Sequence, residues 1–237
     1  MALNTSYGSR PGAAAHAIPA ERAGFIRKTY AHLAGAILAF VLLEVAIFST
    51  PPVRDTLAGL LTQSWLLTLA LFIGASWIAD RWARSDSSRG IQYLGLGIYV
   101  VLQALIFVPL LYTALYYANN DPNLIPTAGL ITGALFLGLT AVVFTTGADF
   151  SFLRGVLILG SLVALGLIVA SLLFGFSLGI VFSAAMVGLA AISILYSTSN
   201  VLHYYRTEQY VAASLSLFAA VALLFYYVLR VLMSLRR

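Results

Sequence analysis

Seven hydrophobic stretches, each long enough to cross a lipid bilayer and nearly free of charge, follow one another along this chain of 237 residues. A helix needs roughly 20 apolar residues to cross a hydrocarbon core of about 30 Å. The composition agrees, because 61% of the residues are hydrophobic, 9% are charged and the mean hydropathy is +0.96. Soluble domains carry about 25% charged residues. We therefore predict an all-α, polytopic membrane protein with seven transmembrane helices.

The expected spans are separated by turn residues or charged connectors. Pro51 follows the first span, and a cluster of Asn, Asp and Pro at 119–123 follows the third; proline cannot continue the helical hydrogen-bond ladder. Lipid offers no partner for backbone polar groups, so each span is expected to be helical. Thr62, Gln63 and Ser64 interrupt the second span. The seven ranges are Phe25–Phe48, Leu57–Ala79, Ile91–Tyr117, Leu124–Phe144, Phe152–Leu173, Leu178–Leu202 and Tyr210–Leu235.

The distribution of Lys and Arg predicts the orientation. Nine cations fall on the side of the N-terminus: Arg10, Arg22, Arg27, Lys28, Arg81, Arg84, Arg89, Arg154 and Arg206. Four fall on the other side: Arg54, Arg230, Arg236 and Arg237. Because cations accumulate on the cytoplasmic side, we expect a cytoplasmic N-terminus. The short chain and the lack of a recognisable targeting segment lead us to expect a bacterial inner membrane. Three of the four outer cations lie at the C-terminus, so either the last span is re-entrant or late charges fail to override the earlier bias. We favour seven full spans, because the last stretch is long enough to cross.

The expected domain organisation is simple. Residues 1–22 are predicted to be a disordered cytoplasmic tail, and residues 23–237 a single seven-helix transmembrane domain. Gly129 with Gly133, and Gly175 with Gly179, form two GxxxG patterns. Such pairs let helices approach closely, although glycine is also simply frequent in membrane helices.

Glu44 is an acidic residue inside a predicted span. A carboxyl group in hydrocarbon is costly and usually marks a function or a partner. Glu44 follows Phe25 by 19 residues, which corresponds to about 28 Å of helical rise, so it is expected near the outer end of the first helix. Two interpretations stay open: a side chain that reaches the outer interface or is capped by a neighbouring helix, or a proton-titrating group on an ion pathway.

The sixth span ends in the polar run 197–200, followed by His203. Ser197, Asn200 and His203 are spaced by three and therefore lie along one drifting helix face. They indicate either hydrogen bonding between helices or the polar mouth of a pore. His32, on the same side of the membrane, is expected to join this mouth or to be a structural histidine.

The remaining charged and polar residues carry no catalytic pattern. Asp80 with Arg81, and Asp149 with Arg154, are expected to be interface charges, and Asp149 is a predicted N-cap of the fifth helix. The chain has no cysteine, and three histidines alone make no metal site. We predict no enzyme activity, no cofactor, no metal and no nucleic-acid partner.

Several segments together resemble the Bax inhibitor-1 family, the transmembrane Bax-inhibitor-motif proteins. They are Phe25–Tyr30 with Leu33, Leu139–Phe144 with Asp149–Ser151, Leu195–Thr198, and Ala212–Phe225. The resemblance covers residues 22–235 and implies a bundle in which six helices surround a central seventh.

The resemblance also implies a function, a leak of Ca²⁺ gated by protons through two aspartates in the sixth and seventh helices. Those positions hold Ser197 and Ala220 in this chain, and the second span lacks the arginine that the family can place there. Two carboxylates that share a proton make such a sensor pH-responsive. We therefore expect a slow leak of Ca²⁺ or another cation with weak or altered pH gating, along Glu44, Ser197, Asn200 and His203. The alternative is a non-conducting protein that regulates a membrane protease or a stress response.

Overall fold

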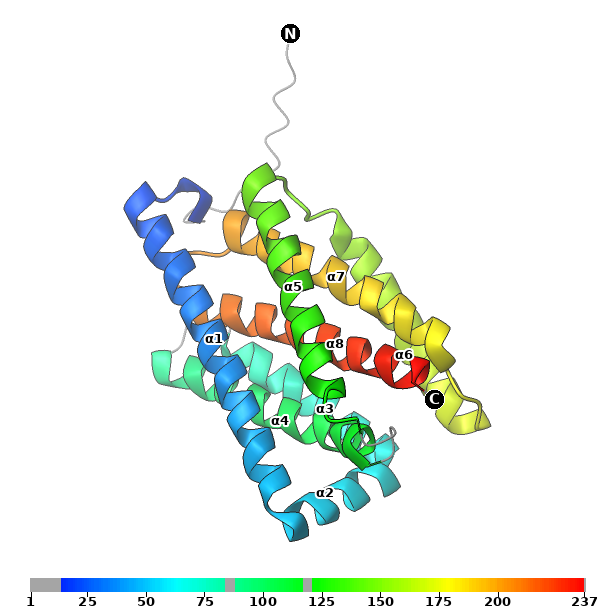
Figure 1. Cartoon of the computed structure of the whole chain (residues 1–237). Helices are drawn as coiled ribbons and strands as arrows, with labels where there is room; N and C mark the ends of the chain where they lie inside the picture. The colour runs from blue at the N-terminus through cyan, green and yellow to red at the C-terminus, as the bar shows by residue number, and fades with distance from the viewer. Residues whose placement is uncertain (1–13, 84–87, 117–120, 237) are drawn as a thin grey trace.

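The computed structural model describes residues 14–83, 88–116 and 121–236, and within these ranges the regular structure is entirely helical (Figure 1). The elements are η1 (Ala14–His16), α1 (Pro19–Ser49), α2 (Pro51–Gln63), α3 (Trp65–Ala83), α4 (Arg89–Tyr116), α5 (Leu124–Thr146), α6 (Leu153–Phe174), α7 (Gly179–His203) and α8 (Tyr210–Leu235). Six of the described helices are long and apolar enough to cross a membrane, and the pair α2–α3 adds a seventh if it forms one span. The predicted all-α, polytopic fold is confirmed.

The second expected span, Leu57–Ala79, is not one straight helix. The chain is helical from Pro51 onward, and the axes of Pro51–Gln63 and Thr68–Ala83 differ by 97°. The break falls at Ser64, directly after the polar residues that interrupt the hydrophobic pattern. Among the described residues of α2 only Ala58 is buried, so little packing holds this helix in line with α3.

Prolines and glycines set several helix ends. Pro19 and Pro51 open α1 and α2, where proline's fixed φ suits the first turn and its missing N–H is not needed. Gly147 and Gly175 end α5 and α6 with φ of 61° and 71°. This left-handed conformation suits glycine and lets its N–H reach a carbonyl of the last turn.

The disordered tail expected over residues 1–22 is wrong for residues 14–22. Ala14 is fully buried, and its N–H donates a hydrogen bond to the carbonyl of Tyr205 over 2.8 Å. This bond fixes η1 beside the connection from α7 to α8, and α1 begins three residues after η1. Residues 1–13 lie outside the described ranges.

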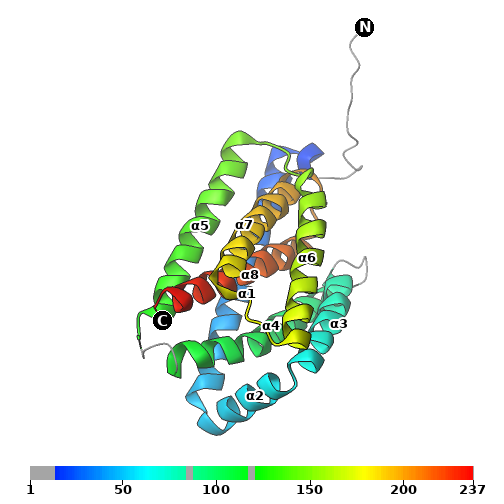
Figure 2. The ribbon, with the colours of Figure 1, turned by 90° about the vertical axis from the view of Figure 1, so that its right-hand side faces the viewer.

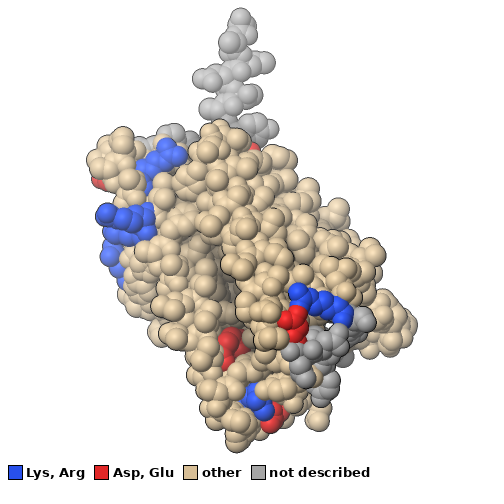
Figure 3. Space-filling view, in the orientation of Figure 1, with Lys and Arg blue, Asp and Glu red and all other residues tan. Residues whose placement is uncertain are grey.

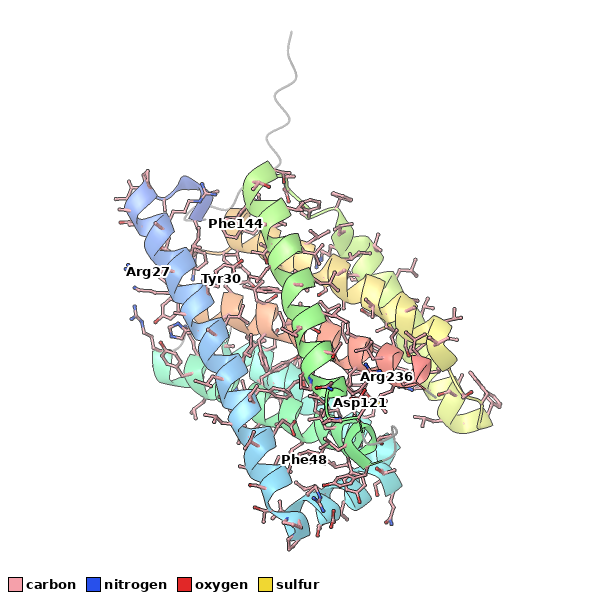
Figure 4. The ribbon with its side chains drawn as sticks, viewed as in Figure 1. Arg27, Tyr30, Phe48, Asp121, Phe144 and Arg236 are labelled. Carbon is pink, nitrogen blue, oxygen red and sulfur yellow. The ribbon has the colours of Figure 1, made fainter. Side chains whose placement is uncertain are left out.

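Helix α8 is the centre of the bundle, as expected for the seventh span. It packs against α1, α3, α4, α5 and α7, whereas α6 packs mainly on α7 (Figures 1 and 2). Its start lies beside the start of α1, where the Lys28 ammonium lies 5.6 Å from the centre of the Tyr210 ring. Its far end lies beside the start of α5, where Arg236 forms an ion pair with Asp121 (Figure 4). The last helix therefore runs the full length of the bundle, and its last residue, Leu235, lies at the opposite end of the bundle from η1 (Figure 1).

Neither predicted GxxxG pair makes a close helix contact. A Cβ added at Gly129 or Gly133 would meet no atom within 4 Å, and Gly175 and Gly179 both adopt positive φ at the turn between α6 and α7. The close approach occurs instead at Gly95 of α4. A Cβ there would lie 2.6 Å from the carbonyl oxygen of Ala79 on α3. The spacing of glycines alone did not distinguish a helix contact from an open surface.

Candidate functional site

A polar pocket lies among α3, α4, α6, α7 and α8 and has a volume of about 410 Å³. Its lining contains one carboxyl group, from Asp80, and hydroxyl groups from all five of these helices. The hydroxyl-bearing residues are Ser76, Tyr99, Ser161, Ser193, Tyr196, Ser197 and Ser216. A pocket rich in oxygen atoms among helices that otherwise carry leucine, valine and alanine is the strongest chemical feature of the bundle.

Asp80 supplies the charge of this pocket. The sequence predicted an interface charge at the end of a span, and the structure places the residue in the pocket wall, one helical turn after Ser76. Ser76 is itself notable, because its buried hydroxyl has no hydrogen-bond partner in the described structure. The signal in the sequence was the four-residue spacing of these two polar side chains, which puts them on one face of α3.

Ser197, the predicted site residue of α7, faces α8 within this pocket. It is buried, and its hydroxyl accepts a hydrogen bond from the hydroxyl of Ser216 over 3.1 Å. Ala220 is also buried and lies one turn beyond Ser216 on α8, but it is not part of the lining. Sequence reasoning therefore found the position on α7 and missed Ser216 as its partner on α8.

The structure does not bring Asn200 and His203 into the pocket with Ser197. His203 approaches the carbonyl oxygen of Ser199 with Nδ1, over 3.0 Å. The hydroxyl of Ser199 accepts a hydrogen bond from the N–H of Phe150, in the connection between α5 and α6, over 2.9 Å. The helix therefore divides its polar run between two sides, because side chains two residues apart point in different directions.

Asp149 belongs to this second cluster. The sequence had predicted Asp149 as the N-cap of α6, and this prediction is wrong. Phe152 is the N-cap of α6, without a side-chain hydrogen bond. Asp149 instead accepts hydrogen bonds from the Tyr204 hydroxyl over 2.6 Å and from the N–H of Ser151 over 2.9 Å. Burial raises the pKa of the Asp149 carboxyl, but these hydrogen bonds outweigh it and hold the pKa below its ordinary value.

His32 belongs to a third group of residues, which ties α1 to α4 and α8. Its Nδ1 lies 2.7 Å from the Lys28 carbonyl oxygen, and its Nε2 lies 3.0 Å from the Tyr93 hydroxyl. The Tyr93 and Tyr210 hydroxyls lie 3.2 Å apart. The sequence left two roles open for His32, part of a polar pore mouth or a structural histidine. These contacts fit the structural role.

Glu44 lies apart from all three groups. It lines an apolar cavity among α1, α4, α5 and α8, and the lining of that cavity shares no residue with that of the Asp80 pocket. Of the four residues predicted for an ion pathway, only Ser197 is thus in the polar pocket.

Comparison with known proteins places the chain in a family. The family model described as inhibitor of apoptosis-promoting Bax1 matches residues 22–237. The chain belongs to the Bax inhibitor-1 family.

Proteins similar to this chain occur in bacteria and plants. The uncharacterized protein PA2604 of Pseudomonas aeruginosa is 36% identical over 113 residues, which is 47% of this chain and 50% of that protein. The chain thus aligns with about half the length of that relative. The BI1-like protein of Arabidopsis thaliana is 29% identical over 219 residues, 89% of this chain and 80% of that protein. Protein LIFEGUARD 4 of the same plant is 30% identical over 218 residues, 87% of this chain and 83% of that protein.

The polar pocket lies close to the two positions at which the Bax inhibitor-1 resemblance expects sensor aspartates. Ser197, which stands where the resemblance expects the first sensor aspartate, lies in the pocket that also holds Asp80. The second expected position, Ala220, lies one turn from the observed partner Ser216. The pocket therefore lies in the region of the bundle where the resemblance expects the two aspartates. Its polar side chains are serines, tyrosines and Asp80 instead.

Proposed function

We propose that this Bax inhibitor-1 family protein is a slow cation leak, with Ca²⁺ as the candidate ion, and that the ion passes through the Asp80 pocket. The observation that carries the proposal is the single carboxyl group of Asp80 set among serine and tyrosine hydroxyls inside a membrane bundle. Calcium is a hard cation that takes six to eight oxygen ligands in flexible arrangements. Charged side chains within membrane proteins commonly mark ion pathways.

The composition of the pocket favours passage over tight binding. Within the described residues no group of three His, Asp or Glu side chains is placed to hold a metal ion. One carboxylate with neutral hydroxyls binds a divalent ion weakly, because affinity rises with the number of charged ligands. Conduction requires a site that the ion enters readily and also leaves.

The same composition favours weak or altered pH gating. Asp80 is the one carboxylate among the described residues of the lining. A pair of carboxylates that shares a proton titrates in two separated steps, and a single carboxylate lacks that coupling. We therefore expect the flux to lack the proton gate that the family resemblance assigns to a coupled pair of carboxyl groups.

The test is Ca²⁺ flux into proteoliposomes at acidic and alkaline pH, with the wild type beside Asp80→Asn and Glu44→Gln. We expect wild-type flux, its loss in Asp80→Asn and its retention in Glu44→Gln. Asp55→Asn is the matched control, because Asp55 is an exposed carboxylate of α2 outside the pocket. Loss in Glu44→Gln with retention in Asp80→Asn would move the pathway to the Glu44 cavity.

Absence of flux from folded wild-type protein would overturn the leak and favour the alternative, a non-conducting partner of a membrane protease or of stress machinery. Deletion of residues 1–13 then tests the tail as the contact site. That deletion keeps the Ala14 hydrogen bond to Tyr205, so it alters the tail without removing η1.

A further inference from the structure

An apolar cavity of about 490 Å³ lies among α1, α4, α5 and α8. The space-filling view shows a hollow between α1 and α5, with acidic atoms beside it (Figure 3). Tyr30 and Phe144 bridge α1 and α5 above it, with ring centres 5.9 Å apart, and Phe48 lies toward its other end (Figure 4). Between these aromatic residues the two helices stay apart.

Two buried polar side chains line this cavity without partners. Glu44 is 7% exposed, and neither of its carboxyl oxygens has a hydrogen-bond partner in the described structure. Thr132 of α5 is 4% exposed, and its hydroxyl is also without a partner. Both belong to the lining. Burying polar groups without hydrogen bonds is costly, so such groups in a native protein require an explanation.

The protein itself supplies no complement to the Glu44 carboxyl. Among the described residues of the lining there is no Lys, Arg or His, and all lining residues other than Glu44 and Thr132 are apolar or glycine. A ligand that satisfies this site therefore carries a hydrocarbon body and a group that donates hydrogen bonds, preferably with positive charge. An ammonium meets this requirement, because it has three N–H donors and forms charge-assisted hydrogen bonds with a carboxylate.

The cavity is open to such a ligand from the side of the bundle. Val41 and Val45 of α1 line it and are 46% and 60% exposed. Gly129 and Gly133 of α5 also line it, and the space beside each has no atom within 4 Å of an added Cβ. These surfaces face the region that lipid occupies around a membrane helix, from which an amphipathic molecule enters tail first or sideways.

We propose that this cavity binds an amphipathic amine, a molecule with one basic amino group on a hydrocarbon body. Its ammonium donates hydrogen bonds to the Glu44 carboxylate and to the Thr132 hydroxyl. Its apolar body lies along Phe40, Phe136 and Phe225, which line the same cavity. This proposal is independent of the cation leak, because the Asp80 pocket takes no part in it.

The test is equilibrium binding of radiolabelled dodecylamine to the protein in phosphatidylcholine nanodiscs, with empty discs subtracted. We expect saturable binding that dodecanol and dodecanoic acid of equal chain length displace poorly. Glu44→Gln keeps the shape of the side chain and removes its charge, and we expect affinity to fall at least about tenfold with the loss of a charge-assisted hydrogen bond.

A second pair of variants tests the cavity rather than the charge. Gly133→Leu places a side chain in the open space of the lining and is expected to abolish binding. Gly138→Leu is its matched control, because Gly138 is an exposed glycine of α5 outside the lining, with no atom within 4 Å of an added Cβ. We expect Gly138→Leu to bind as the wild type does.

Three outcomes overturn the proposal: equal affinity of folded Glu44→Gln and the wild type, equal displacement by dodecanoic acid, or unchanged binding in Gly133→Leu. Circular dichroism and gel filtration establish folding. If Glu44→Gln does not fold, the Gly133→Leu and Gly138→Leu pair decides the matter. If phosphatidylethanolamine in the discs competes with dodecylamine, the amine is that of a lipid headgroup. If it does not compete, the ligand is a free amphiphilic amine.

Discussion

The Ser216 hydroxyl on α8 donates a hydrogen bond to the Ser197 hydroxyl on α7, with 3.1 Å between the two oxygen atoms. Ser197 and Ser216 therefore lie directly opposite one another. Because α7 and α8 are antiparallel neighbours, the residue one turn further along α8, Ala220, lies opposite the residue one turn earlier on α7, Ser193. A carboxyl group at Ser216 would thus be closer to one at Ser197 than a carboxyl group at Ala220.

The first prediction installs a carboxylate pair in the pocket. In Ser197→Asp/Ser216→Asp the two carboxyl groups face each other and share a proton, which separates their titrations. We expect Ca²⁺ flux in proteoliposomes to differ more between acidic and alkaline pH in this variant than in the wild type. Ser197→Asp/Ala220→Asp is the control, and the difference between acidic and alkaline pH is expected to be smaller because its two carboxyl groups lie farther apart, on a diagonal. A larger pH effect in the control than in Ser197→Asp/Ser216→Asp would contradict the observed register of α7 and α8.

The second prediction concerns the contact between α3 and α4. Gly95→Ala places a methyl group against the Ala79 carbonyl and the Ala83 amide, 2.6 and 2.7 Å away, so the two helices must separate. Overpacking of this kind costs about 1–3 kcal/mol, and we expect a lower midpoint of thermal unfolding in detergent. Gly97→Ala is the control, since an added Cβ there meets nothing within 4 Å. An equal effect of the two substitutions would exclude a close contact at Gly95.

The third prediction concerns Asp149 and Tyr204. The Tyr204 hydroxyl bonds to the ionised form of Asp149, so Tyr204→Phe is expected to raise the pKa of Asp149 toward its ordinary value. A lowered pKa in the folded protein contributes stability above the unfolded pKa, and this contribution is lost as pH falls through the folded pKa. The effect on stability is small, because Asp149 is exposed. The carboxyl carbon chemical shift during an acid titration measures the pKa.

Tyr93→Phe serves as the control for this titration. Tyr93 lies in the His32 cluster and makes no hydrogen bond with Asp149. We expect the pKa of Asp149 to be unchanged in Tyr93→Phe. A similar shift in both variants would indicate a general change in the bundle.

The fourth prediction tests orientation. Seven described cations lie at the end of the bundle where α1 begins: Arg22, Arg27, Lys28, Arg81, Arg89, Arg154 and Arg206. By the positive-inside rule this end is expected to be cytoplasmic. The chain has no cysteine, so single substitutions at exposed connector positions report the side directly. In intact cells a membrane-impermeant maleimide is expected to label Asn123→Cys and to spare Ser88→Cys until the cells are permeabilised; the opposite pattern would invert the topology.

The sequence predicted the helices well and their contacts poorly. The span Tyr210–Leu235 coincides with α8 residue for residue, because hydropathy reports whether a segment prefers lipid to water. The polar residues 62–64 also marked where α2 ends, but not that the chain bends there by 97°. Contacts between helices depend on shape, and Gly129 and Gly95 show that the same residue type serves an open cavity in one helix and a backbone contact in another.

The candidate sites divide in the same way. Glu44 and Ser197 stood out because polar side chains are rare in apolar spans. The sequence predicts Asp80 as an interface charge and does not single out Ser216, since nothing in the local sequence tells which helix a polar side chain faces. Only the packing of α3 and α8 shows that both residues line one pocket.

The sequence by itself determined that this chain is a helical membrane protein, where most of its hydrophobic helices lie, and to which family it is similar. These properties follow from the transfer of side chains from water to lipid, which each segment undergoes largely on its own. Only the tertiary structure decided that Ser197 meets Ser216, that Asp80 shares their pocket, and that Glu44 lies alone in an apolar cavity. Inside lipid, burial of apolar surface distinguishes poorly between helix neighbours, so shape and hydrogen bonds between distant segments select the arrangement.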